Sequence, residues 1–172
     1  MEETVTSTGD KRSVGVKYGL ISAVVGIVFF LVLVFAGQNP YLIKWGWVVS
    51  ITTTVVLVVL AHKEYKDDND GFMTYGQGIG IGVWFMLVGV GVGMLFNYIY
   101  TAFIDPNIMT AFYDSQYEQM QQRGMNDQQI EMALGFTKKL FWVFGIIGAC
   151  FFSMVTVLIV TIFTQKRPPE QR

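Results

Sequence analysis

The sequence has one cysteine, Cys150, and one histidine, His62. A single cysteine excludes an intrachain disulfide and a thiolate metal cluster, and a single histidine leaves no second imidazole for a zinc site. Only 15% of the residues are charged, compared with about 25% in a typical soluble protein. The net charge of −1 provides no concentrated basic surface that would bind nucleic acid. We therefore expect no cofactor and no nucleic-acid partner.

Charge is absent from four long apolar stretches, which dominate the 172 residues. A helix needs roughly 20 apolar residues to cross the hydrocarbon core of a bilayer, which is about 30 Å thick. The stretches do not alternate apolar and polar residues as barrel strands do. The sequence therefore predicts an all-α, single-domain polytopic membrane protein (residues 1–172) with four membrane-spanning helices: Tyr18–Ala36, Trp45–Ala61, Ile79–Tyr100 and Leu140–Phe163.

Lysine and arginine are distributed unequally between the two sides of these spans, and they favour the cytoplasmic side. One side holds Lys11, Arg12, Lys17, Lys63, Lys66, Lys166, Arg167 and Arg172, and the other holds Lys44, Arg123, Lys138 and Lys139. We therefore expect both termini in the cytoplasm, with a polar tail at residues 1–14 and a cytoplasmic tail at residues 164–172. His62, at the inner border of the second span, is expected to be an interfacial side chain.

The long connection between spans three and four has a helical pattern. Asp105-Pro106 is typical of a helix start, Gly124 of a helix end, and Asn126 with Gln129 of a second start. Apolar residues at helical spacing form one stripe. We predict an extracytoplasmic amphipathic hairpin at residues 105–131, with a candidate interaction face made of Met109, Phe112, Tyr113, Tyr117 and Met120.

Small residues recur four apart in the first and third spans, a spacing that lets two helices approach closely in lipid. We predict helix packing, within the bundle or between copies, at Gly15, Gly19, Gly26, Gly76, Gly80, Gly82, Gly89 and Gly93. No Asp, Glu, Lys, Arg or His lies inside the spans, which argues against a proton-coupled transporter. No convergent pair of acid, base or nucleophile is visible, so we expect no enzyme activity.

Three segments resemble one known family. They are Lys17-Tyr18-Gly19, the turn DDNDGFMTYGQG before span three, and FIDPNIM followed by YEQMQQRGMNDQQIE. Together the order of segments resembles the bacterial membrane-protein family called domain of unknown function 4199, from about Val14 to Phe163. The resemblance implies a four-helix inner-membrane protein of Gram-negative bacteria, and it implies no activity and no functional residue.

These observations favour a non-enzymatic interaction or scaffold protein of the bacterial inner membrane. Its expected partners are the lipid bilayer, another membrane or periplasmic protein contacted through the hairpin, and a second copy of the chain in a homo-oligomer. The alternative is a small oligomeric transport or channel subunit, and a weaker alternative is a lipid-modifying membrane enzyme.

Overall fold

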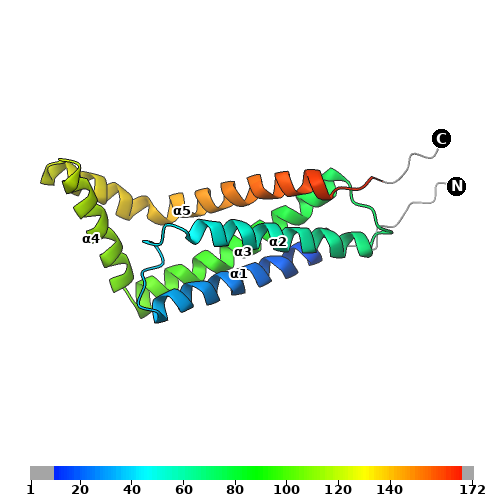
Figure 1. Ribbon diagram of the computed structural model, residues 1–172, viewed down its shortest axis with the longest axis horizontal. Helices are drawn as coiled ribbons and strands as arrows, with labels where there is room; N and C mark the ends of the chain where they lie inside the picture. Colours follow the sequence, from blue (N-terminus) through cyan, green and yellow to red (C-terminus); the bar gives the residue numbers. More distant parts are fainter. Residues whose placement is uncertain (1–9, 168–172) are drawn as a thin grey trace.

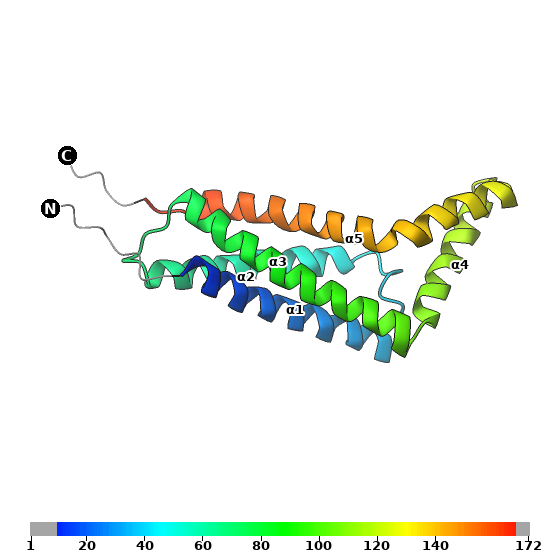
Figure 2. The same cartoon turned by 180° about the vertical axis from the view of Figure 1, so that it is seen from behind.

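The computed structural model describes residues 10–167, which form a bundle of long helices (Figures 1 and 2). α1 begins and α5 ends at one end of the bundle, here called the terminal end, and α4 lies at the opposite end (Figure 1). This is expected of an even number of spans, because each span reverses the direction of the chain along the bundle. In chain order the helices are α1 (Lys11–Phe35), α2 (Gly46–Asp67), α3 (Tyr75–Ile99), the π-helical turn η1 (Tyr100–Ile104), α4 (Asn107–Gln122) and α5 (Asp127–Thr164).

Four of these helices are long and apolar enough to cross a membrane, namely α1, α2, α3 continued by η1, and α5. The all-helical architecture with four spans is therefore confirmed. α1 already begins at Lys11, within the predicted polar tail of residues 1–14. The other residues of that tail, 1–9, and residues 168–172 of the predicted C-terminal tail lie outside the described part of the chain.

The predicted helix start at Asn126 is confirmed, α3 begins earlier than predicted, and α4 begins one residue after the predicted Asp105-Pro106 start, with Pro106 as its N-cap. Asn126 and Gln129 form a reciprocal capping box at the start of α5, and Thr74 forms another with Gln77 at α3. Asp105 Oδ1 accepts a hydrogen bond from the backbone N–H of Asn107, where α4 begins. Gly124, with φ of +81°, follows the end of α4 in a backbone conformation that favours glycine.

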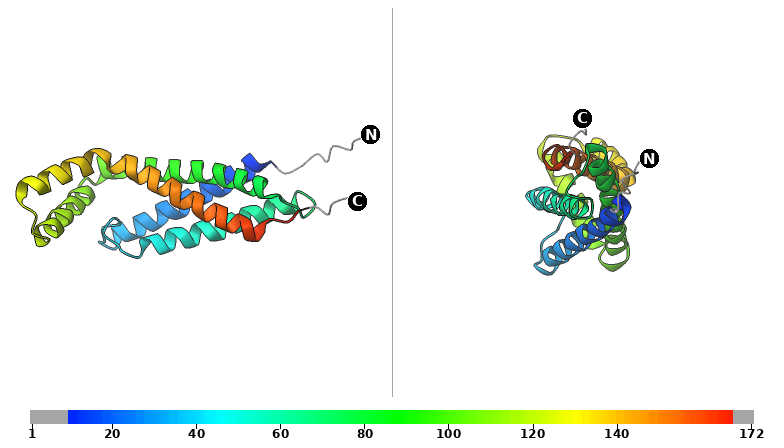
Figure 3. Two further views of the ribbon diagram at one scale, coloured as in Figure 1. Left: turned by 90° about the horizontal axis from the view of Figure 1, so that it is seen from above. Right: turned by 90° about the vertical axis from the view of Figure 1, so that its right-hand side faces the viewer.

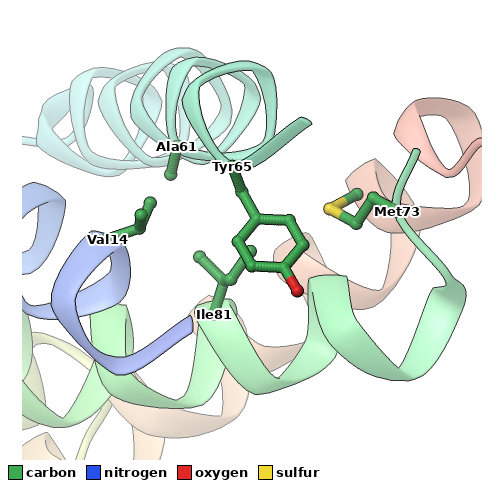
Figure 4. Close-up of a cluster of buried hydrophobic side chains, with 5 residues drawn as sticks. All are labelled: Val14, Ala61, Tyr65, Met73 and Ile81. Carbon is green, nitrogen blue, oxygen red and sulfur yellow. The ribbon is translucent and has the colours of Figure 1, made fainter. Parts of the chain in front are cut away.

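The tightest helix pair is α1 with α3, and most fully buried side chains lie toward the terminal end. One cluster joins Val14 of α1, Ala61 and Tyr65 of α2, Met73 of the α2–α3 connection and Ile81 of α3, as Figure 4 shows, with the Tyr65 ring between Met73 and Ile81. A second cluster joins α2, α3 and α5 through Leu57, Val58, Phe85, Val157 and Val160. In lipid such contacts stabilise through close packing rather than through exclusion of water.

His62 is not the interfacial side chain that the sequence predicted, because its side chain is fully buried. Its Nε2 donates to the carbonyl oxygen of Gly78 in α3 at 3.2 Å, since a carbonyl can only accept. Its Nδ1 lies 2.7 Å from the hydroxyl oxygen of Thr164 at the end of α5. Lys66 Nζ donates to the Thr164 carbonyl at 3.1 Å. One side chain of α2 is therefore bonded to both α3 and α5.

Candidate functional site: the arm beyond the bundle

α4 and the first turns of α5, residues 107–139, project beyond the bundle and are here called the arm (Figure 1). α5 has 38 residues. At 1.5 Å per residue this helix is about 57 Å long, compared with about 30 Å for the hydrocarbon core. The predicted second helix of the hairpin and the fourth span are thus one continuous helix, whose first turns lean away from its remaining axis (Figure 3).

The predicted interaction stripe of α4 is turned toward the protein's own chain. All five members, Met109, Phe112, Tyr113, Tyr117 and Met120, are half-buried. The ring centroid of Phe112 lies 5.4 Å from that of Phe141 in α5, and the Tyr113 ring lies 6.4 Å from the same ring. Such edge-to-face pairs stabilise a hairpin beyond their buried area. The stripe therefore closes the arm onto α5, and it is not a free face for a partner.

Tyr41, in the connection between α1 and α2, joins the arm to the bundle. Its ring contacts Phe30, Phe112 and Phe141 in edge-to-face geometry, with centroids 5.5 to 6.2 Å apart. Burial raises the pKa of Tyr41 to about 12, so the phenol remains a neutral donor. Its hydroxyl lies 3.4 Å from Asn97 Oδ1. No sequence pattern indicates this role, since a lone tyrosine after Asn39-Pro40 is compatible with any exposed loop.

Polar contacts fix the rest of the arm. Asn39 Nδ2 donates to the Ile108 carbonyl at 2.7 Å, which ties the α1–α2 connection to the start of α4. The Tyr117 hydroxyl donates to Asp127 at 2.9 Å, and this hydrogen bond to a carboxylate raises the pKa of Tyr117. Lys138 Nζ lies 5.2 Å from the centre of the Tyr113 ring. The arm is held at its base, its middle and its tip.

The outer face of the arm is apolar as well. Ile130 and Leu134 of α5 are 0% and 8% exposed. Met132 and Phe136 are 67% and 64% exposed. At about 100° per residue, these two side chains lie roughly 200° around the helix from the buried pair. Packing against α4 accounts for Ile130 and Leu134, and no contact among residues 10–167 covers Met132 and Phe136.

Comparison with known families matches residues 17–166 of this chain to the family described as "Protein of unknown function (DUF4199)". The chain belongs to this family. The family resemblance that three sequence segments indicated is thereby confirmed. No curated protein and no solved structure matches the chain.

In this DUF4199 chain the predicted packing glycines divide into two groups. A Cβ built on Gly15 would lie 2.6 Å from the Ile81 carbonyl oxygen, and one on Gly19 would lie 2.8 Å from that of Phe85. Gly89 approaches Gly19 across the same α1–α3 contact, and Gly82 lies directly against Val157 of α5. Gly78, which the candidate set omits, lies equally close to Thr161, since its Cβ would be 2.6 Å from Thr161 Cγ2.

The other glycines do not bring helices together. Gly80 has only the flexible Lys11 side chain nearby, at 3.4 Å. Around Gly26, Gly76 and Gly93 no atom of a neighbouring helix lies within 4 Å of an added Cβ. For these three the expected helix contact is not present within one copy of the chain.

Across residues 10–167 no group of three or more His, Cys, Asp or Glu side chains is placed to hold a metal ion. Cys150 is half-buried in α5, and His62 is engaged on both ring nitrogens as described above.

Proposed function

We propose that this membrane protein acts as a non-enzymatic interaction protein, and that it binds a partner protein through the outer face of the arm. The observation that supports this is the exposed pair Met132 and Phe136, on a helix whose opposite face, with Ile130 and Leu134, is already buried. Large exposed aromatic and thioether side chains next to each other are typical of interface cores. The arm presents them on a braced scaffold, so little ordering is needed on binding.

The distribution of basic residues supports an extracytoplasmic arm in a bacterial inner membrane. The terminal end of the bundle carries the larger share of lysine and arginine, so we place both termini in the cytoplasm. The arm then lies on the opposite side, in the periplasm of a Gram-negative cell. The partner is accordingly a periplasmic protein or the external part of a membrane protein.

Lys138 and Lys139 favour a protein partner over the lipid surface. Both are exposed and precede the long apolar part of α5, so they are placed at the level of the headgroups. Phe136 lies about one turn and Met132 about two turns beyond Lys139, which places Met132 roughly 10 Å farther from the hydrocarbon. Side chains at that distance lie outside the acyl-chain region and do not contact it.

The oligomeric transport subunit receives less support from the structure. Assembly through glycine faces requires those faces to be free on the surface of one copy. Of the eight candidate glycines, four (Gly15, Gly19, Gly82 and Gly89) are instead used in contacts between helices of the same chain, which leaves only Gly26, Gly76, Gly80 and Gly93 for such assembly.

Photo-crosslinking tests the interaction proposal. A photoreactive phenylalanine analogue is placed at Phe136 or Met132 in the full chain, and at Glu118 as an exposed control on α4. We expect a discrete protein adduct in native membranes from the first two positions and none from Glu118. Phe136→Ser should remove the adduct formed from position 132, with unchanged amounts of inserted protein. Adducts with lipid alone, or equal protein adducts from all three positions, would contradict the proposal.

A further inference from the structure

A cleft of about 570 Å³ lies among the membrane-spanning helices, separate from the arm's outer face. All four spans contribute to its wall, and Tyr41 and Pro40 of the α1–α2 connection border it. Ala23 and Phe85 line it and belong to the buried core toward the terminal end. A volume in the range of about 300–1,000 Å³ is typical of sites that hold a small organic molecule.

Two of the glycines that make no helix contact account for the room in this cleft. Gly26 of α1 and Gly93 of α3 both line it, and an added Cβ at either position would meet no atom within 4 Å. A leucine at either place would project into the cleft. The small residues are therefore used here to leave space beside a helix rather than to join two helices.

Three serine hydroxyls on the wall of the cleft have no hydrogen-bond partner among residues 10–167. They are Ser22 of α1, Ser50 of α2 and Ser153 of α5, so they come from three different spans. Neighbouring threonines behave differently: Thr54 donates to the Ser50 carbonyl at 2.9 Å and Thr156 to the Phe152 carbonyl at 2.8 Å. Hydroxyls inside a bilayer ordinarily bond back to their own helix in this way. Three free donors on the wall of one cleft favour a molecule with hydrogen-bond acceptors.

No charged side chain of the described residues lines the cleft. A charge brought to this depth would lack a counter-ion in a medium of low dielectric constant, which is strongly unfavourable. The remaining wall is largely apolar, with rings such as Phe29 and Phe30 and aliphatic chains such as Ile51 and Val90. The matching ligand is therefore apolar, uncharged and equipped with acceptor oxygens.

We propose that this cleft is a binding site for an uncharged lipid whose ester carbonyl oxygens accept hydrogen bonds from Ser22, Ser50 and Ser153. The hydrocarbon part of the lipid lies along the apolar wall, in the space that the missing side chains of Gly26 and Gly93 leave open. The site is independent of the partner contact proposed for Met132 and Phe136. Tyr41 borders the cleft and also packs against Phe112 of the arm, so the two regions share one side chain.

Three photoreactive lipids of equal chain length test the site in the full chain reconstituted in phosphatidylcholine nanodiscs. They are a diacylglycerol with a diazirine on one acyl chain, the corresponding alkane without an ester, and the corresponding phosphatidic acid, which is charged. We expect the diacylglycerol to label the peptides around the cleft more strongly than either of the others. Ser22→Ala with Ser153→Ala should reduce the diacylglycerol adduct by about tenfold, for two lost hydrogen bonds, and leave the alkane adduct unchanged.

Gly93→Leu fills the cleft and should abolish labelling there by all three lipids. Gly148→Leu is the matched control, because Gly148 also lies in a membrane-spanning helix with no atom within 4 Å of an added Cβ, and it does not line the cleft. Equal labelling by the three lipids that the serine variants do not change would overturn the proposal. Reaction of a water-soluble maleimide with Ser153→Cys, in a Cys150→Ser background, would also overturn it, since the cleft would then hold water.

Discussion

Replacing Gly19 with leucine is expected to lower the free energy of unfolding by about 3 kcal/mol or more, the upper end of what overpacking costs in a well-packed core. A Cβ at this position would lie 2.8 Å from the Phe85 carbonyl oxygen, 3.0 Å from Val88 Cβ and 3.3 Å from the Gly89 backbone nitrogen. Two of these neighbours are backbone atoms of α3, which cannot rotate away as the end of a side chain does. α1 and α3 would have to separate along their main contact.

Gly26→Leu is the control for this effect. It introduces the same side chain two turns farther along α1, where no atom lies within 4 Å of the added Cβ. Thermal unfolding in mild detergent should show a large loss for Gly19→Leu and little change for Gly26→Leu. Equal tolerance of both substitutions would mean that α1 and α3 do not meet at Gly19.

His62→Ala is expected to destabilise the terminal end by about 2–4 kcal/mol. The substitution leaves a cavity at a fully buried position, and it removes the hydrogen bonds to the Gly78 carbonyl and the Thr164 hydroxyl. The cavity contributes a cost of this order, the two lost hydrogen bonds add to it, and relaxation of the surrounding structure recovers part of it. The C-terminal end of α5 should loosen first.

Limited proteolysis with trypsin in detergent checks this expectation, with cleavage after Lys166 as the readout, because Pro168 blocks cleavage after Arg167. Lys63→Ala is the matched control, because Lys63 is the next residue of α2 and is exposed. We expect faster cleavage for His62→Ala and an unchanged rate for Lys63→Ala. An unchanged rate in both variants would show that His62 does not hold α5 in place.

The membrane architecture was predictable because its signals are local. A run of uncharged residues has only one stable backbone solution in hydrocarbon, so the four spans follow from the sequence. The start at Asn126 follows from a side chain that bonds to the backbone three residues away. Gly124 ends α4 because of its own backbone conformation.

Which face of a helix meets which neighbour was not predictable in the same way. The stripe containing Phe112 is apolar whether it covers α5 or a partner, and only the position of Phe141 decides between the two. Gly26 and Gly19 share a spacing pattern, yet one lines a cleft and the other touches α3. His62 has partners in α3 and α5 that are distant in sequence, so a border position alone suggested the wrong environment.

The outer face of the arm is a second case in which the sequence does not determine which helix face is covered. Met132 and Phe136 are four residues apart, which places them on one helix face, but Ile130 and Leu134 have the same spacing. The sequence therefore shows two apolar faces on one helix. Only the position of α4 determines which face is covered and which is left exposed.

Labelling of single cysteines in intact cells tests the central claim, that the arm stands outside the membrane on the side opposite the termini and presents Met132. Met132→Cys and Lys63→Cys are each made in a Cys150→Ser background and overproduced, so that free copies outnumber any partner. A membrane-impermeant maleimide should modify Met132→Cys in intact Gram-negative cells whose outer membrane has been permeabilised, and Lys63→Cys only after lysis. Modification of Lys63→Cys before lysis, with Met132→Cys protected, would contradict the account.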